Sequence, residues 1–175
     1  MKTKVIVIVV MCLIVTLCGC GKKKTIRNTS LPGKDYALQF PDTWEIKDTG
    51  VMGTDLIGLS PLEDPQDTFR ENVTVMLESM PESMTDAEYL KLTLTNMSNI
   101  FGLPSEANFT KTKVGTADGY HLLYSMQMGQ NEMDNDVYIV IDKGAVYVLT
   151  CSHLKGKRNA FKATMDAVIE TFAIK

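Results

Sequence analysis

Two adjacent segments with large apolar side chains at consecutive positions constrain the fold most. Residues 137–141 read VYIVI, residues 146–149 read VYVL, and Lys143 and Gly144 lie between them. Successive side chains of a strand point to opposite faces of its sheet, so strands of this kind are buried on both faces. A Lys-Gly pair between such segments indicates a tight hairpin turn. We therefore expect two central strands in a sheet that carries helices on both faces.

A second hairpin and several earlier strands are expected to complete this sheet. Asp118 and Gly119 lie between strand candidates at 109–116 and 120–128, and Asp-Gly is a strong short-range hairpin signal. Alternating or β-branched segments precede this hairpin and indicate further strands at 36–40, 56–59 and 72–78. A polar loop is expected between the last two of these, over residues 61–68.

Two helices are indicated by apolar side chains at helical spacing. Thr85 and Glu88 have the spacing of a capping box, in which each side chain satisfies a backbone amide at a helix start. Five apolar positions follow before Gly102 and Pro104 end the pattern, namely Ala87, Leu90, Leu94, Met97 and Phe101. A C-terminal helix is indicated by Phe161, Met165, Val168 and Phe172. Each stripe is expected to face a core.

The order of these elements predicts the fold class. Strands come first, then a helix, then four strands in two hairpins, and finally a second helix. Hairpins make neighbouring strands antiparallel and need no crossover helix. Residues 35–175 are therefore predicted to form one α+β domain, an antiparallel β-sheet flanked by helices on both faces in an α/β/α sandwich.

The N-terminus has the features of an export signal. Lys2 and Lys4 precede an apolar run from Val5 to Leu17, and this run of about 13 residues is shorter than the roughly 20 that a membrane span needs. The run ends in Leu17-Cys18-Gly19-Cys20, which resembles the bacterial lipobox. The alternatives are an ordinary signal cut after a small residue and an uncleaved anchor. We predict cleavage between Gly19 and Cys20, with lipid attached to the Cys20 thiol.

Lipidation at Cys20 predicts the location of the protein. Residues 1–19 would be the signal peptide and residues 20–34 a flexible tether, whose Lys22, Lys23 and Lys24 either attract anionic headgroups or only begin the tether. Two or three acyl chains hold a protein stably at a membrane, whereas one does so only marginally. The protein would face outward from a single membrane. In a cell with two membranes we expect the outer membrane or periplasmic side. The residue after the acylated cysteine is Gly21, and not the aspartate that would act as a retention signal.

The charge balance argues against a nucleic-acid-binding protein, and the cysteines argue against a domain held by internal disulfides. The whole chain has 18 basic and 21 acidic residues, and cleavage would remove Lys2 and Lys4, so the mature body is mildly acidic. This balance argues against a nucleic-acid partner, which a clustered basic face would contact. Once Cys20 is acylated, only Cys151 remains, so no internal disulfide can form. Its apolar, strand-like surroundings predict a buried thiol.

Three segments of the chain resemble the PsbP-like superfamily. They are residues 36–44 (YALQFPDTW), residues 147–152 (YVLTCS) and the segment from Phe161 to Phe172, which ends in IETF. The resemblance covers about residues 35–175. The superfamily includes the extrinsic photosystem II subunit, the Ran-binding Mog protein and the bacterial lipoprotein DcrB. It implies a non-enzymatic accessory or binding role. The plant subunit's docking extension has no counterpart in this chain, so a photosynthetic role does not carry over.

No catalytic residues are predicted, and the chain is not expected to be an enzyme. A nucleophile would need an adjacent base, and the only two histidines, His121 and His153, fall in or at the end of predicted strands. The sequence has no nucleophile elbow, phosphate-binding glycine loop, HExxH helix or Cys-x-x-Cys pair. A lone strand histidine is more typical of a satisfied or exposed side chain than of a catalyst.

Two groups of residues carry atoms that could bind a metal, and a role without metal is favoured for each. The oxygen-rich stretch from Asn131 to Asp136, around Asp134, lacks the alternate ligands, turn glycine and distal glutamate of a calcium loop, and a solvated hairpin tip is favoured instead. Met126 and Met128 share a strand face near Met133, and thioether sulfur suits cuprous ion. Methionine is also a flexible core filler. No metal or cofactor is therefore predicted.

These observations favour a non-catalytic accessory or binding lipoprotein of the cell envelope. Its expected partners are membrane lipid, through Cys20, and an envelope protein held at a sheet edge or a helix-flanked groove. The alternative is a lipoprotein that binds a small ligand or a metal. An enzyme of unfamiliar type is the third hypothesis, and a deep pocket that joins His121 or His153 to a carboxylate would favour it.

Overall fold

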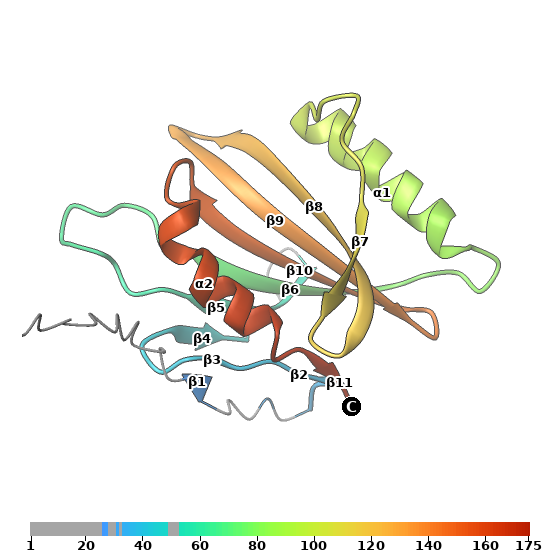
Figure 1. The fold of residues 1–175 in the computed structure, drawn as a ribbon, viewed down its shortest axis with the longest axis horizontal. Coiled ribbons are helices and arrows are strands. Elements are labelled where there is room, and N and C mark those ends of the chain that lie inside the picture. The colour runs from blue at the N-terminus through green and yellow to red at the C-terminus, as the bar shows by residue number, and fades with distance from the viewer. Residues whose placement is uncertain (1–25, 28–30, 32, 49–52) are drawn as a thin grey trace, which may run out of the picture.

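The computed structural model describes residues 26–27, 31, 33–48 and 53–175 (Figure 1). The elements follow in the order β1 (Ile26–Arg27), β2 (Tyr36–Ala37), β3 (Phe40–Pro41), β4 (Glu45–Lys47), β5 (Thr54–Leu59), β6 (Asn72–Ser79), α1 (Asp86–Phe101), β7 (Thr110–Val114), β8 (Ala117–Met128), β9 (Asn131–Asp142), β10 (Ala145–Leu154), α2 (Arg158–Ile169) and β11 (Ala173–Ile174).

The main sheet has seven strands in the order β4-β5-β6-β10-β9-β8-β7, and each neighbouring pair is antiparallel. Two short pairs, β1-β3 and β11-β2, accompany it. Strands β9 and β10 lie at the centre of the sheet, as their apolar sequences predict. The predicted α+β class and the order of elements are confirmed.

Helix α2 and the segment from Tyr36 to Trp44 cover one face of the sheet, which we call the α2 face (Figure 1). Tyr36, Tyr147 and Phe172 form its aromatic centre, with ring centroids 5.5 to 6.2 Å apart. Edge-to-face and offset ring contacts at such distances stabilise a core beyond the area that they bury. Leu38, Val73, Val75 and Leu149 are fully buried in the same cluster. This face holds the larger of the two cores.

Helix α1 lies on the opposite face, which we call the α1 face. Tyr89 of α1 packs with Val137, Ile139 and Val146, and Leu90 and Met97 join this smaller cluster. Alternation along β9 assigns the faces, because Val137 and Ile139 belong to this cluster whereas Val140 belongs to the other one. The prediction of helices on both faces is therefore confirmed.

One predicted hairpin turn is confirmed and the other is wrong. Lys143 and Gly144 both have positive φ, 49° and 83°, and join β9 to β10 as a primed turn. The β7-β8 turn lies at Gly115 and Thr116, and Asp118 and Gly119 lie inside β8. Gly115 has a φ of 57°, and a side chain there would collide with the carbonyl oxygen of Phe172. Its lack of a side chain therefore fixes the turn three residues earlier than the Asp-Gly signal indicates.

The ends of the two helices differ in how the sequence specifies them. The Thr85 amide donates to Glu88 Oε2 at 2.8 Å, and the Glu88 amide donates to Thr85 Oγ1 at 3.3 Å, so the predicted capping box is present. Gly102 ends α1 in the left-handed conformation, with a φ of 64°. Helix α2 begins without a side-chain cap and ends at Ile169. Phe172 therefore lies beyond the helix, although it is buried in the core.

The predicted signal peptide, with Gly19 and Cys20, lies outside the described residues. Within the predicted tether, β1 pairs with β3, Leu31 belongs to the core, and the Lys34 ammonium donates to Asp55 Oδ1 at 2.7 Å. The boundary at residue 35 stays a prediction, and these preceding residues contact the domain. Among the described helices, neither is long and apolar enough to span a membrane.

Candidate functional site

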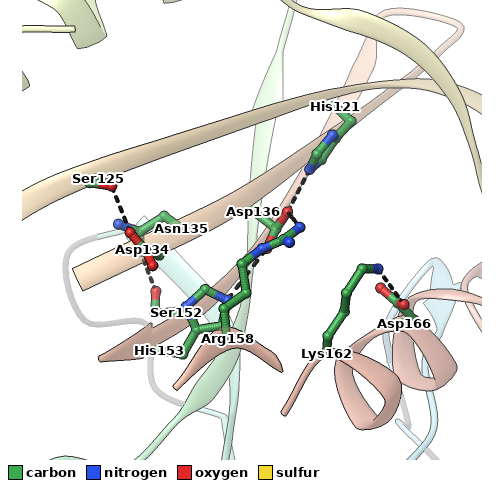
Figure 2. A network of polar contacts seen from close by, with 10 residues as sticks. All are labelled: His121, Ser125, Asp134, Asn135, Asp136, Ser152, His153, Arg158, Lys162 and Asp166. Atoms are coloured by element: carbon green, nitrogen blue, oxygen red, sulfur yellow. Dashed lines mark hydrogen bonds and ion pairs between the residues drawn. The ribbon is translucent and has the colours of Figure 1, made fainter. Parts of the chain in front are cut away.

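A cluster of polar side chains, two of them an ion pair, lies on the α2 face beside the N-terminus of α2 (Figure 2). We call it the Asp136 cluster, and its members are His121, Asp136, His153 and Arg158. Arg158 donates two hydrogen bonds to the Asp136 carboxylate, from Nε to Oδ2 at 2.9 Å and from Nη2 to Oδ1 at 2.8 Å. His121 Nε2 lies 2.8 Å from Oδ1, and His153 Nε2 lies 3.4 Å from Oδ2.

Burial and hydrogen bonding act in opposite directions on Asp136. Its side chain is 8 % exposed, and this burial raises the pKa of the carboxyl. The bonds from His121, His153 and Arg158 outweigh burial and hold the pKa of Asp136 well below its usual range. A buried carboxylate with a bidentate guanidinium partner stays ionised and well ordered. The cluster therefore ties β8, β9, β10 and α2 together through one charge.

This arrangement favours a structural role over catalysis. Each oxygen of Asp136 accepts from Arg158 and also lies next to a histidine nitrogen, so the carboxylate acts as an ionised anchor for three neighbouring side chains. Ser125 donates to Asp134 at 2.6 Å, and Ser152 donates to Asn135 at 2.7 Å, so neither hydroxyl is paired with a histidine. The hollows described below are lined by other side chains. The third hypothesis gains the pairing of two histidines with a carboxylate, and neither histidine nor Asp136 lines any of the hollows described below.

Sequence reasoning did not find the Asp136 cluster. The sequence predicts His121 and His153 as isolated histidines and places Asp136 in a solvated hairpin tip. The available signal was alternation, because Asp136, Tyr138 and Val140 fall on one face of the central strand. A charged residue at such a position needs partners. The His121 ring also lies against Tyr138, with centroids 4.7 Å apart.

The α1 face carries a groove between α1 and the β7-β8 hairpin, which we call the α1 groove. Two hollows of about 410 Å³ and 320 Å³ form it, and Lys111 and Tyr120 line both. The second hollow is floored by apolar side chains from α1 and the start of β7, namely Ala87, Leu90, Leu94 and Phe109. The predicted α1 stripe therefore only partly faces a core, because Ala87 is exposed and Leu94 is half-buried.

Strand β7 forms one edge of the seven-strand sheet, next to this groove. Its backbone pairs with β8 on one side only within the described residues. An edge strand presents unpaired amide and carbonyl groups that an added strand can use. Lys111 and Lys113 alternate along β7 and keep this edge polar. The α1 groove thus combines an apolar floor with a hydrogen-bonding edge.

The remaining predicted sites fall in different parts of the structure. Residues around Asp134 do not form a loop but the first half of β9, and the turn lies at Gly129 and Gln130. This prediction of a hairpin tip was wrong because β8 and β9 pair without interruption up to the Met128-Asn131 register. Met126 lies directly opposite Met133 across these strands. No group of three or more His, Cys, Asp or Glu side chains among the described residues is arranged to hold a metal ion.

Cys151 is buried on the α2 face, as predicted. Burial in these apolar surroundings raises the pKa of its thiol, which removes the thiolate that nucleophilic chemistry needs. Cys151 therefore acts as a small core side chain.

The fold defined by this sheet and its two helices is the PsbP/Mog1-like α+β fold. The chain is similar to the cyanobacterial PsbP (CyanoP) of Synechocystis, with 16% identity and a TM-score of 0.63 over 92% of this chain and 99% of that chain. It is also similar to LpqN of Mycobacterium tuberculosis, described as involved in cell envelope biogenesis, with 17% identity and a TM-score of 0.58 over 86% of this chain and 90% of that one.

A third similar structure is the Ran-binding protein Mog1p of Saccharomyces cerevisiae, with 9% identity and a TM-score of 0.55 over 86% of this chain and 96% of that chain. No family model matches the chain, and no curated protein matches it. At these identities the likeness extends to the fold alone.

Proposed function

We propose that this chain is an exported bacterial lipoprotein, anchored by acylated Cys20, that binds an envelope protein in the α1 groove without catalysing a reaction. The observation that carries the proposal is the open apolar floor of the groove beside the free edge of β7. LpqN, which has the same fold, is described as involved in cell envelope biogenesis, and this description supports an envelope role here.

The proposed binding mode is the addition of an extended segment of the partner to β7. Main-chain hydrogen bonds would supply affinity, and alternate side chains would enter the hollows next to Leu90, Leu94 and Phe109. Lys111 and Lys113 would lie opposite the added segment, so acidic side chains there are favoured over basic ones. The groove would then act as the binding site, and the α2 face would hold the fold.

In-cell photo-crosslinking tests this binding mode. A photoreactive residue in place of Lys111, which lines both hollows, should give a covalent adduct of defined mass. The matched control carries the same residue in place of Lys162, which is 45 % exposed on α2 at the other face. An adduct at position 111 and none at position 162 is the expected result. No adduct at 111, or the same adduct at both positions, would contradict the proposal.

The anchor has its own test, which does not depend on the groove. Cys20→Ala removes the thiol that takes the lipid, so fatty-acid labelling and membrane fractionation should both be lost. The control is Cys151→Ala, which leaves the proposed lipobox intact and should keep both. Unchanged labelling and fractionation in Cys20→Ala would exclude lipidation at this residue.

A metal-binding lipoprotein is the second candidate, and one observation favours it. Met126 and Met133 lie directly opposite each other, and Met128 is exposed on the same strand face. Thioether groups gathered in this way suit cuprous ion. Metal analysis of the full chain loaded with cuprous ion, compared with a Met126→Leu, Met128→Leu double variant, tests this candidate. Equal copper content in the two proteins would exclude these methionines as the site.

A further inference from the structure

A third hollow lies away from the α1 groove, beside the loop of residues 61–70. It has a volume of about 210 Å³ and is lined mainly by polar side chains of this loop, of the start of β6 and of the α2 N-terminus, namely Glu63, Asp64, Gln66, Asp67, Glu71, Leu154 and Lys157. Four of these side chains carry carboxylates and one carries an ammonium. The hollow is therefore acidic, unlike the α1 groove.

The three carboxylates on the rim already have donors. Asp67 accepts from the amides of Glu63 at 2.9 Å and Phe69 at 3.1 Å, and Asp64 accepts from the amide of Gln66 at 2.8 Å. Glu63 accepts from the Lys157 ammonium. These contacts hold the loop in shape and leave little for a ligand at the rim.

The Glu71 side chain differs from those on the rim. Glu71 is only 2 % exposed and lines the hollow, yet its Oε2 atom has no hydrogen-bond partner. Leaving a buried acceptor unpaired costs its full desolvation free energy, so such atoms are rare without a reason. The unpaired oxygen points to a group that the protein itself does not supply.

Two neighbouring polar atoms have the same deficit. The Ser60 amide donates to the Glu71 carbonyl at 2.8 Å, which continues the β5-β6 register, and the β6-β10 register beyond Ser152 brings His153 opposite Glu71. Ser60 and His153 therefore share the α2 face with Glu71. Ser60 Oγ and His153 Nδ1 are both buried and unpartnered. Three unpaired atoms thus lie on neighbouring segments, one just after β5, one just before β6 and one in β10.

We propose that this acidic hollow binds an organic cation, a guanidinium or ammonium group, whose N–H donors pair with Glu71 Oε2 at the floor. A calcium ion needs six to eight oxygens at 2.3–2.6 Å, and the described side chains hold no such set. A guanidinium needs only one or two acceptors and adds charge-assisted hydrogen bonds. Its source is either a free small cation or a basic side chain of a partner protein. The site is separate from the α1 groove, so its failure would leave the proposed function unaffected.

The proposal is tested by titrating the full-length chain in detergent with methylguanidinium. The readout is the shift of the amide resonances of residues 60–71 and 153–157. We expect saturable shifts in these residues. Glu71→Gln should weaken binding by about tenfold, because a charge-assisted acceptor is lost. Lys157→Met should strengthen binding, because it frees Glu63 from its own ammonium partner. Asp86→Asn is the matched control, because it removes a carboxylate from the larger hollow of the α1 groove. It should leave binding unchanged.

A capped tripeptide with a central arginine, compared with the same peptide carrying glutamine, distinguishes the two sources. Tighter binding of the arginine peptide than of methylguanidinium would assign the site to a partner side chain, and equal binding would assign it to a free cation. Both outcomes support the proposal. It is overturned if methylguanidinium gives no saturable shifts, if Glu71→Gln binds equally well, or if calcium alone produces the shifts.

Discussion

The two faces of the central sheet bury their side chains in different ways. The α2 face holds a continuous aromatic and aliphatic core, and the Asp136 cluster continues it toward the N-terminus of α2. The α1 face has a smaller cluster under α1 and an open groove beside it. Both helices pack on the same sheet, so the two faces differ in how much of the sheet each helix leaves uncovered.

Under the proposed function, this difference separates stability from recognition. Completely buried side chains dominate folding free energy, whereas half-buried apolar side chains beside an unpaired strand edge are free to contact another molecule. Substitutions on the α2 face should therefore unfold the protein. Substitutions in the α1 groove should change binding and leave folding largely intact.

The largest expected effect is the loss of an aromatic ring on the α2 face. Phe172→Ala should lower the free energy of unfolding by about 3–5 kcal/mol, because it removes a fully buried ring that packs on Tyr36 and Tyr147. Leu94→Ala, in the groove, should cost about 1 kcal/mol or less, because Leu94 is half-buried. Urea unfolding of both full-length variants measures the two values. Equal costs would contradict the division between the faces.

A smaller loss is expected from the charge that joins four elements. Asp136→Asn should destabilise the fold by about 2–3 kcal/mol, because Arg158 and His153 lose charge-assisted hydrogen bonds. Asp118→Asn is the control, since Asp118 is 91 % exposed and pairs with Lys113 at the hairpin. That pair should contribute much less, because water screens an exposed ion pair. Thermal unfolding monitored by circular dichroism checks the order of the two variants.

Two glycines with positive φ give the next comparison. Gly115→Ala forces a methyl toward the Phe172 carbonyl oxygen, so it should cost more than the roughly 1 kcal/mol expected for a left-handed position alone. Gly102 ends α1, and a side chain at this position would meet no described atom beyond its chain neighbours within 4 Å. Gly102→Ala should therefore cost only that smaller amount. The difference between the two unfolding free energies reports the close approach on the α2 face. Identical values would place that approach in doubt.

The smallest expected effects are those of pH, and two carboxyls should act in opposite directions. Because the folded pKa of Asp136 is lowered, its stabilisation is present above its ordinary pKa of 3.8 and is lost as the pH falls through the lowered value. Burial raises the pKa of Glu71, so its contribution is present below 4.5 and is lost as the pH rises through the raised value.

The two pH dependences are separated by measuring the free energy of unfolding across the acid range for the parent, Asp136→Asn and Glu71→Gln. Asp136→Asn should lose less stability than the parent on acidification. Glu71→Gln should lose less than the parent as the pH rises above 4.5. The reverse assignment of the slopes would contradict the environments described for these two carboxyls.

The fold was predictable where local sequence signals and packing agree. The capping box at Thr85 and the left-handed glycine at 102 fix both ends of α1, and the central apolar strands require cover on both faces. The β7-β8 turn was misplaced because Gly115 is required by contact with Phe172, which is distant in sequence. The start of α2 has no side-chain cap and gives no comparable signal.

The sites were less predictable than the fold because they depend on strand register. His121, Asp136, His153 and Arg158 meet only when three strands pair in the observed register. The α1 groove likewise depends on how far α1 lies from β7, which no apolar stripe specifies. Cys20 is the opposite case, because its prediction rests on four consecutive residues and needs no tertiary structure.

The most direct test of the division between faces is crosslinking from position 111 in a variant that blocks the groove. Leu94→Glu places a charge on the apolar floor while leaving the α2 face untouched. The predicted result is loss of the adduct with the urea midpoint nearly unchanged. An adduct that persists in Leu94→Glu, or one that disappears only together with the fold, would contradict the account.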